Sequence, residues 1–211
     1  LKIPNQKVPM HTKEERARLQ KAFGYTYEDL KTSILPMALN GSESIGAMGI
    51  DTPLAVLSNK HQPLFNYFKQ LFAQVTNPPI DSIREKVVTS TTVYLGTDGN
   101  VLEEKAENCK QLKINDPILT NTDLLKIKNM KVDGFKVETI PIIYYKNTSL
   151  EKAIDHLFVE VDRAHREGAN IIILSDRGVD ENHVAIPSLL AVSALQQYLV
   201  QTKKRTAMAG I

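Results

Sequence analysis

Along the first part of the chain, apolar residues recur every three or four positions, which is the spacing of amphipathic helices. "HTKEERARLQKAFG" predicts a helix with a capping box at Thr12 and Glu15 and an end at Gly24. "TYEDLKTSIL" predicts a second helix that begins at Thr26 and stops at Pro36. "PLFNYFKQLFAQV" predicts a third helix with an aromatic face. We therefore expect a mainly helical N-terminal third.

Strand signals begin near residue 90. "STTVYLG" and "VLEE", separated by "TDGN", predict a β-hairpin whose turn is formed by Asp98 and Gly99. "ILTNTDLLKIKNM" then predicts a capped helix. The middle of the chain should therefore add one antiparallel strand pair and one helix.

From residue 135 onward, predicted strands alternate with predicted helices. "FKVETIPIIYY", "NIIILS" and "TAMAG" have the pattern of strands, whereas "SLEKAIDHLFVEVDRAHREG" and "PSLLAVSALQQYLVQTKK" have the pattern of helices. This order is typical of right-handed βαβ units with a parallel sheet. The uninterrupted run "IIIL" fits a strand that is covered on both faces. The sequence therefore predicts the α/β class.

The composition argues against nucleic acid and membranes as partners. The 26 basic and 24 acidic residues give a net charge of +2 without a basic tract, which argues against nucleic acid because phosphate binding needs concentrated positive charge. No apolar run reaches the 18 or so residues that cross a bilayer, so we expect no membrane segment. The single cysteine, Cys109, excludes an internal disulfide and fits a reducing compartment. We expect a cytoplasmic protein, with a plastid as the alternative.

The loop "SDRGVDENH", residues 175 to 183, is the strongest enzyme-like cluster in the chain. It follows the apolar strand at its carboxyl end, where parallel α/β proteins usually place ligands. Asp176, Arg177 and His183 offer acid, anion-binding and base chemistry together. The other interpretation is that Asp176 and Arg177 form an ion pair that fixes the loop.

Two further candidates have a structural interpretation that we favour. His156 and Glu160 have the four-residue spacing of a metal pair, but they lie opposite the apolar stripe of their predicted helix and are expected on its solvated face. Cys109 has no histidine near it in sequence and is expected to be a structural thiol. We therefore expect no metal site and no catalytic cysteine.

The stretch "QVTNPPID", residues 74 to 81, places Asn77 directly before Pro78 and Pro79. A residue before proline is disfavoured in the helical region, and the prolines offer no N–H group. Carbonyl groups at the end of the preceding helix therefore find no donors within the helix. These groups could accept hydrogen bonds from a small donor, or the stretch could be a rigid stop between two helices.

Several longer strings resemble the central domain of glutamate synthase. They are "AFGYTYEDL", "ILPMA", "GAMGIDTPLAVLS", "YFKQLFAQVTNPPIDSIRE", "ILSDRGVD" and "PSLLAVSA". They occur in order and extend the resemblance over residues 16 to 206. The resemblance implies a rudimentary, incomplete relative of a flavin-type (TIM-like) barrel.

The resemblance also sets the expected domain organisation. Residues 1–15 would be a linker and residues 16–211 the central domain. Within that domain, residues 16–89 would form a mainly helical part and residues 90–211 an α/β part that is truncated at its C-terminus. Because the chain begins with Leu1, we expect it to be a piece of a longer precursor.

The resemblance implies a parent enzyme, glutamate synthase, an oxidoreductase in which a glutamine amidotransferase domain is joined to an FMN-binding domain. These two domains of the same chain are the expected partners. Ammonia from glutamine would pass through a tunnel to 2-oxoglutarate, and FMN, supplied with electrons by an iron–sulfur cluster, would reduce the imine. We expect neither cofactor in this segment. Leu1 and Cys109 do not match the amidotransferase nucleophile, so the segment alone should be inactive.

In the family, main-chain atoms of a Thr-Asn pair help to form the mouth of the ammonia tunnel. The matching residues here are Thr76 and Asn77. Two alternatives remain open. One is an independent α/β domain that binds a small anionic ligand at Asp176, Arg177 and His183. The other is a docking module that uses the aromatic segment from Phe65 to Phe72.

Overall fold

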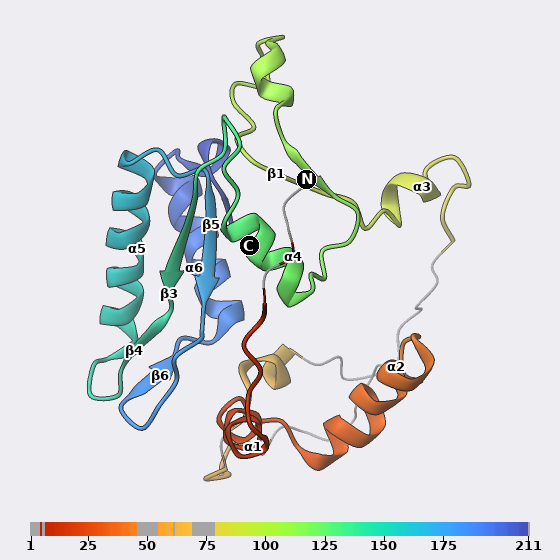
Figure 1. Ribbon diagram of the computed structural model, residues 1–211, viewed down its shortest axis with the longest axis vertical. Coiled ribbons are helices and arrows are strands. Elements are labelled where there is room, and N and C mark those ends of the chain that lie inside the picture. Colours follow the sequence, from red (N-terminus) through yellow and green to blue (C-terminus); the bar gives the residue numbers. More distant parts are fainter. Residues whose placement is uncertain (1–4, 6, 46–54, 61, 69–78, 211) are drawn as a thin grey trace. The chain divides into compact units, whose positions relative to one another are not determined.

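The structure is a computed structural model, and it describes residues 5, 7–45, 55–60, 62–68 and 79–210. The chain divides into two compact units (Figure 1). One unit is Pro9–Glu85, and the other combines Leu1–Val8 with Lys86–Ile211. The predicted domain limits at residues 15 and 89 stay predictions.

The first unit is helical where it is described. It contains α1 (Lys13–Ala22), a π-helix (Asp29–Ile34), α2 (Leu35–Asn40) and a 3₁₀ helix (Leu64–Phe68). The predicted capping box of α1 is confirmed, because the side chain of Thr12 accepts from the backbone N–H of Glu15 and the side chain of Glu15 accepts from that of Thr12. Gly24 follows α1 with φ of +75°, a backbone conformation that L side chains rarely adopt.

The prediction that the second helix stops at Pro36 is wrong. The helical path continues through Pro36 to Asn40 and ends at Gly41, whose φ is +61°. The π-helix before it shifts the hydrogen-bond register, since the N–H of Leu35 donates to the carbonyl of Leu30. Pro36 therefore falls in the first turn of α2, where a missing N–H leaves no intrahelical bond unmade.

No described side chain of the first unit is buried, although many are large and apolar. Met10 is 90% exposed, and Tyr27 and Phe68 are 76% and 72% exposed. A unit with so little buried apolar surface has little to offset the conformational entropy that folding removes. Its stability must therefore come from surfaces outside its own described residues.

The second unit holds the strands. In chain order its elements are β1 (Val93–Leu95), a 3₁₀ turn (Ala106–Cys109), β2 (Leu112–Ile114), α4 (Asn121–Lys128), β3 (Val137–Pro141), β4 (Ile143–Tyr145), α5 (Leu150–Arg166), β5 (Ile171–Ser175), β6 (His183–Ala185), α6 (Ser188–Gln201), a 3₁₀ turn (Arg205–Ala207) and β7 (Ala209–Gly210). The short α3 (Glu85–Val88) lies across the division between the units.

The βαβ units predicted from the sequence are confirmed. The parallel sheet has the strand order β3-β5-β7, with Val137 paired with Ile171 and Ile171 paired with Ala209. In Figure 1, β3 and β5 run in the same direction, with α5 and α6 alongside them. Among the described residues the strands form small parallel and antiparallel sheets rather than a closed barrel, which agrees with the predicted incomplete α/β fold.

Each face of the parallel sheet carries its own core. Ile140, Ile142 and Ile172 pack with the buried residues of α5 and α6. Ile171 packs on the opposite face with Leu95 and with Ile127 and Met130 at the end of α4. Alternation of side chains along a strand produces this division, so the β1–β2 pair and α4 fill the face that a barrel would turn inward.

The predicted hairpin partner is wrong in position. β1 pairs with β2, Val93 opposite Ile114, rather than with "VLEE" at residues 101 to 104. The Asn108 side chain donates to the carbonyls of Asn100 and Glu103, which holds that stretch in a compact turn. The turn signal at Asp98 and Gly99 pointed to a strand after it, but local side-chain hydrogen bonds favour a further turn.

A layer of hydrogen bonds closes the amino end of the parallel sheet. The side chain of Asn170 donates to the carbonyl of Gly134 and accepts from the N–H of Lys136. The N–H of Asp98 donates to the carbonyl of Thr206. Asn170 thus ties the segments that precede β3 and β5 to each other, and Asp98, in the loop after β1, holds the segment that precedes β7.

We predict that Leu157→Ala lowers the free energy of unfolding by about 2 to 5 kcal/mol, because it leaves a cavity in a packed core. Leu157 on α5 is only 2% exposed. Val159→Ala on the same helix is the control, since Val159 is 60% exposed and its loss should cost no more than about 0.5 kcal/mol. Urea unfolding measures both variants, and equal losses would contradict the assigned core.

Candidate functional site

The carboxyl end of the parallel sheet is where the chain changes its pairing. The N–H of Ile142 donates to the carbonyl of Ser175 on β5, and the carbonyl of Ile142 accepts from the N–H of Ile186. β4 then leaves the parallel sheet and pairs antiparallel with β6, with Tyr145 opposite His183. The loop from 176 to 182 connects β5 to β6 at this edge.

Asp180 organises that loop. Its Oδ1 accepts from the backbone N–H groups of Asn182 and His183, both at 2.8 Å, and lies 2.9 Å from Nδ1 of His183. These interactions, with the N–H of Asn182 as the largest, hold the pKa of Asp180 below its ordinary value. The imidazole of His183 also meets the ring of Tyr145 edge-on, with centroids 6.1 Å apart.

The other two predicted loop residues have separate environments. The guanidinium of Arg177 donates to Oδ1 of Asn121, the first residue of α4, at 2.9 Å. Asp176 is half-buried, and among the described residues no ion pair joins it to Arg177. The structure therefore gives Arg177 and His183 different partners, and a shared ligand site at Asp176, Arg177 and His183 stays a prediction.

Thr76 and Asn77 lie outside the described residues. Their expected position at the mouth of an ammonia tunnel therefore stays a prediction. The chain is described again from Pro79.

A hollow of about 370 Å³ opens between the first half of α5 and the β3–β4 segment. Buried side chains of Ile142, Leu157 and Ile186 form part of its floor. His156 and Glu160 line it from α5. This pair was expected on a solvated face, and His156 is indeed exposed. Among the residues the structure describes, no group of three or more His, Cys, Asp or Glu side chains could hold a metal ion.

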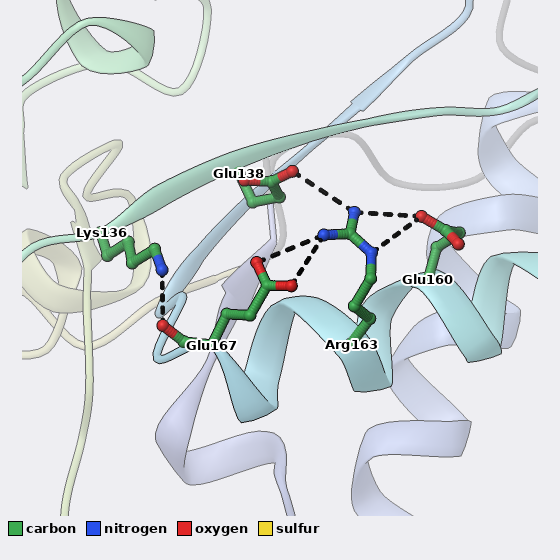
Figure 2. A network of polar contacts seen from close by, with 5 residues as sticks. All are labelled: Lys136, Glu138, Glu160, Arg163 and Glu167. Carbon is green, nitrogen blue, oxygen red and sulfur yellow. Dashed lines mark hydrogen bonds and ion pairs between the residues drawn. The ribbon is translucent and has the colours of Figure 1, made fainter.

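Beside this hollow, Arg163 holds three carboxylates together, as Figure 2 shows. Its guanidinium lies 3.1 Å from Glu160 on α5 and from Glu167 directly after α5, and 3.6 Å from Glu138 on β3. Hydrogen bonds that the guanidinium donates to Glu160 and then to Glu167 raise the pKa of Arg163 above its ordinary value. The network links α5 to the edge of the sheet and leaves more negative than positive charge around Arg163.

A second polar cluster joins α5 to the end of α6. Asp162 accepts from the hydroxyl of Tyr198 at 2.7 Å and from Nζ of Lys204 at 2.6 Å. Desolvation alone would raise the pKa of Asp162, but the hydrogen bonds from Lys204 and Tyr198 outweigh it and the pKa is lowered. Phe158 stacks on Tyr198 with centroids 4.2 Å apart. The cluster therefore forms a polar contact between α5 and the end of α6.

Cys109 lies at the end of a 3₁₀ turn and is exposed, with a free thiol. The expectation that Cys109 is a structural thiol stays a prediction. No helix in the described part of the chain has both the length and the apolar character needed to cross a membrane.

Together, these features define an α/β protein in which Arg163, Asp162 and Arg177 join separate elements. Comparison with known proteins identifies the family. The family described as "Glutamate synthase central domain" matches residues 18–211. The chain belongs to this family.

Three relatives show the extent of the similarity. The glutamate synthase (NADPH) large chain of Bacillus subtilis is 44% identical over 192 residues, which is 91% of this chain and 12% of that protein. The glutamate synthase (NADH) of Schizosaccharomyces pombe is 42% identical over 89% of this chain and 9% of its own length. Ferredoxin-dependent glutamate synthase 2 of Synechocystis sp. is 44% identical over 88% of this chain and 12% of its own length. The chain thus spans about a tenth of the curated relatives it matches.

The sequence did not indicate the hollow, the strand β6 or the Arg177–Asn121 contact. The hollow depends on the space between α5 and the β3–β4 segment, which no local pattern encodes. β6 has only three residues, "HVA", and such a short run carries little periodicity. The contact between Arg177 and Asn121 spans 56 positions of sequence.

We predict that the loop hydrogen bonds of Asp180 persist above its ordinary pKa and are lost as pH falls through the lowered pKa of the folded state. The sign follows from the lowered pKa, because the carboxylate is the form that accepts these bonds. The NMR shifts of the Asn182 and His183 amide protons should follow this titration. Asp180→Asn should remove the step, and a step of unchanged size in the variant would contradict the assignment.

Proposed function

We propose that this chain is the connecting central domain of a glutamate synthase, joining an amidotransferase domain to an FMN-binding synthase domain. The observation that carries the proposal is the family match over residues 18–211, together with relatives that are 42% to 44% identical over most of this chain. In the parent protein, the amide nitrogen of glutamine would be transferred reductively to 2-oxoglutarate. This segment would hold the two active sites at their working separation.

The described contacts support a scaffolding role. Arg177 is bound to Asn121, and Asp180 is bound to the backbone of its own loop. Arg163 and Asp162 each tie α5 to a neighbouring element, β3 and the end of α6. Polar groups that are used in this way stabilise the positions of elements. The exposed apolar residues of the first unit suit contacts with neighbouring domains.

The cofactors of the parent enzyme would be held by its other domains. An iron–sulfur cluster takes about four thiolate ligands, whereas this chain has one cysteine, so its residues do not fit a cluster. FMN would likewise lie in the synthase domain. We place the protein in the cytoplasm or in a plastid, and one relative, from Oryza sativa, is named as chloroplastic.

Thr76 and Asn77 are the residues of this chain that we propose for the wall of the ammonia tunnel. The physical support is the sequence itself: Asn77 precedes Pro78 and Pro79, so a helix that ended here would leave its last carbonyl groups without intrahelical donors. Ammonia is a small neutral molecule that can donate hydrogen bonds to such carbonyl groups.

A docking function for the aromatic segment has a specific observation in its favour. Phe65, Tyr67 and Phe68 in the 3₁₀ helix are each more than half exposed. Exposed aromatic side chains are typical anchors of protein interfaces. This function is compatible with a connecting domain, because the surface it would dock against belongs to a neighbouring domain.

We predict that the purified 211-residue chain shows neither glutaminase nor 2-oxoglutarate-dependent activity and takes up no FMN. The reason is that the proposed chemistry belongs to the other domains. Activity assays and the flavin absorbance spectrum after incubation with FMN measure this directly. A flavin-loaded chain or measurable turnover would contradict the proposal.

We predict that Thr76→Trp in the full-length protein uncouples glutamine hydrolysis from reductive glutamate formation. A bulky side chain at the tunnel mouth should obstruct transfer of ammonia while leaving the glutaminase chemistry in place. Glutamine hydrolysed and reductant oxidised, equal in the parent, should diverge in the variant. Thr76→Ser is the control and should keep them equal, and equal amounts in Thr76→Trp would count against the tunnel assignment.

A further inference from the structure

The outer side of the β3–β4 segment is an open strand edge. In the order β3-β5-β7, β3 has one neighbour among the described residues, and β4 pairs only with β6. Ile142 directs both its N–H and its carbonyl toward β5 and β6. Because backbone groups alternate along a strand, those of Ile143 point to the opposite, outer side.

The β4–β6 ladder confirms this alternation. The N–H of Ile186 donates to Ile142 and the N–H of Lys146 donates to Asn182, so the residues of β4 facing β6 are the even-numbered ones. Ile143, opposite Ala185, is in a non-hydrogen-bonded pair. Its N–H and carbonyl are thus available to a further strand. Pro141 offers no N–H on the same side, so pairing would centre on Ile143 rather than on β3.

The hollow lies on the face of the β3–β4 segment that packs against α5. A strand added at the open edge would direct side chains toward this face. Ile142 belongs to the core that β3 shares with α5, and Tyr144 packs against that core. His156 and Glu160 of α5 line the same hollow. Alternate side chains of an added strand would point to this face, and one of them would enter the hollow. A volume of about 370 Å³ accommodates a large apolar side chain.

The charged residues beside the hollow indicate which charge an added strand would carry. Glu138, Glu160 and Glu167 surround the single guanidinium of Arg163. Lys136, whose Nζ donates to the carbonyl of Glu167, is the second cation of this network, so three carboxylates and two cations leave a net charge of −1. A lysine or arginine on the incoming segment would be attracted to this rim, whereas an acidic segment would be repelled.

We propose that the outer edge at Ile143, with the hollow lined by His156 and Glu160, receives an extended segment from another domain of the full-length polypeptide. The segment pairs with the backbone of Ile143, places an apolar side chain in the hollow and carries a basic residue beside Glu160. This inference rests on the proposed function. It commits to the same polypeptide because nine-tenths of the length of the relatives lies outside the matched region.

Site-specific photocrosslinking in the full-length protein tests the proposal. p-Benzoylphenylalanine is placed at His156, which lines the hollow, and separately at Asp155, an exposed neighbour on α5 that does not line it. We expect His156→p-benzoylphenylalanine to crosslink within the same polypeptide to a segment outside residues 1–211, identified by mass spectrometry. Asp155→p-benzoylphenylalanine should not reach that segment. A crosslink to a second copy, to another protein or to residues 1–211, or no crosslink, would overturn the proposal.

A backbone variant separates strand pairing from simple proximity. Ile143→Pro removes the outward N–H and should lower the His156 crosslink to the level of the Asp155 control, with the fold retained. Tyr144→Pro removes an N–H directed at β6 and is the matched variant that should instead disrupt the β4–β6 pair. An undiminished crosslink in a folded Ile143→Pro protein would refute strand pairing. The Thr76→Trp experiment measures the coupling of glutamine hydrolysis to glutamate formation and does not depend on this strand edge. A negative crosslinking result would therefore overturn the strand-pairing proposal without overturning the proposed function.

Discussion

The pairing of β5 with strands on both of its sides is the constraint on which the second unit depends. Ile171 and Ile172 are fully buried, one in each core, and they belong to a strand hydrogen-bonded to β3 and β7. The connections between these parallel strands run through helices, α5 and α6, which cover one face of the sheet. The β1–β2 pair and α4 cover the opposite face. Both faces of the sheet are thus covered, although its described strands do not close into a barrel.

Several polar residues hold the elements around this sheet in place. The amino end of the sheet is tied by Asn170 and by Asp98, and the carboxyl end continues into the β4–β6 pair. Arg163 and Asp162 attach α5 to its two neighbours. Such contacts stabilise the positions of elements within the second unit, which is what the proposed connecting role requires. The first unit differs, because its described apolar side chains are not buried among themselves.

Strong local signals made much of this structure predictable from the sequence. The apolar run of β5 and the stripe of α5 are long, and the order of strands and helices after residue 135 allows few topologies. The failures have particular causes. A π-helical turn carried the chain through Pro36, and the side chain of Asn108 turned residues 101 to 104 away from strand pairing. The environment of Arg177 depended on Asn121 in α4, a contact too distant in sequence to infer.

Our central proposal is that the second unit supplies its own core, whereas the first unit takes its stability from other domains of a longer polypeptide. Amide hydrogen exchange, compared between this chain alone and the full-length protein, tests it most directly. We expect the amides of Ile171 to Ile173 to be protected in both, and those of α1 and α2 to be protected only in the full-length protein. Equal protection of α1 and α2 in the isolated chain would contradict the account.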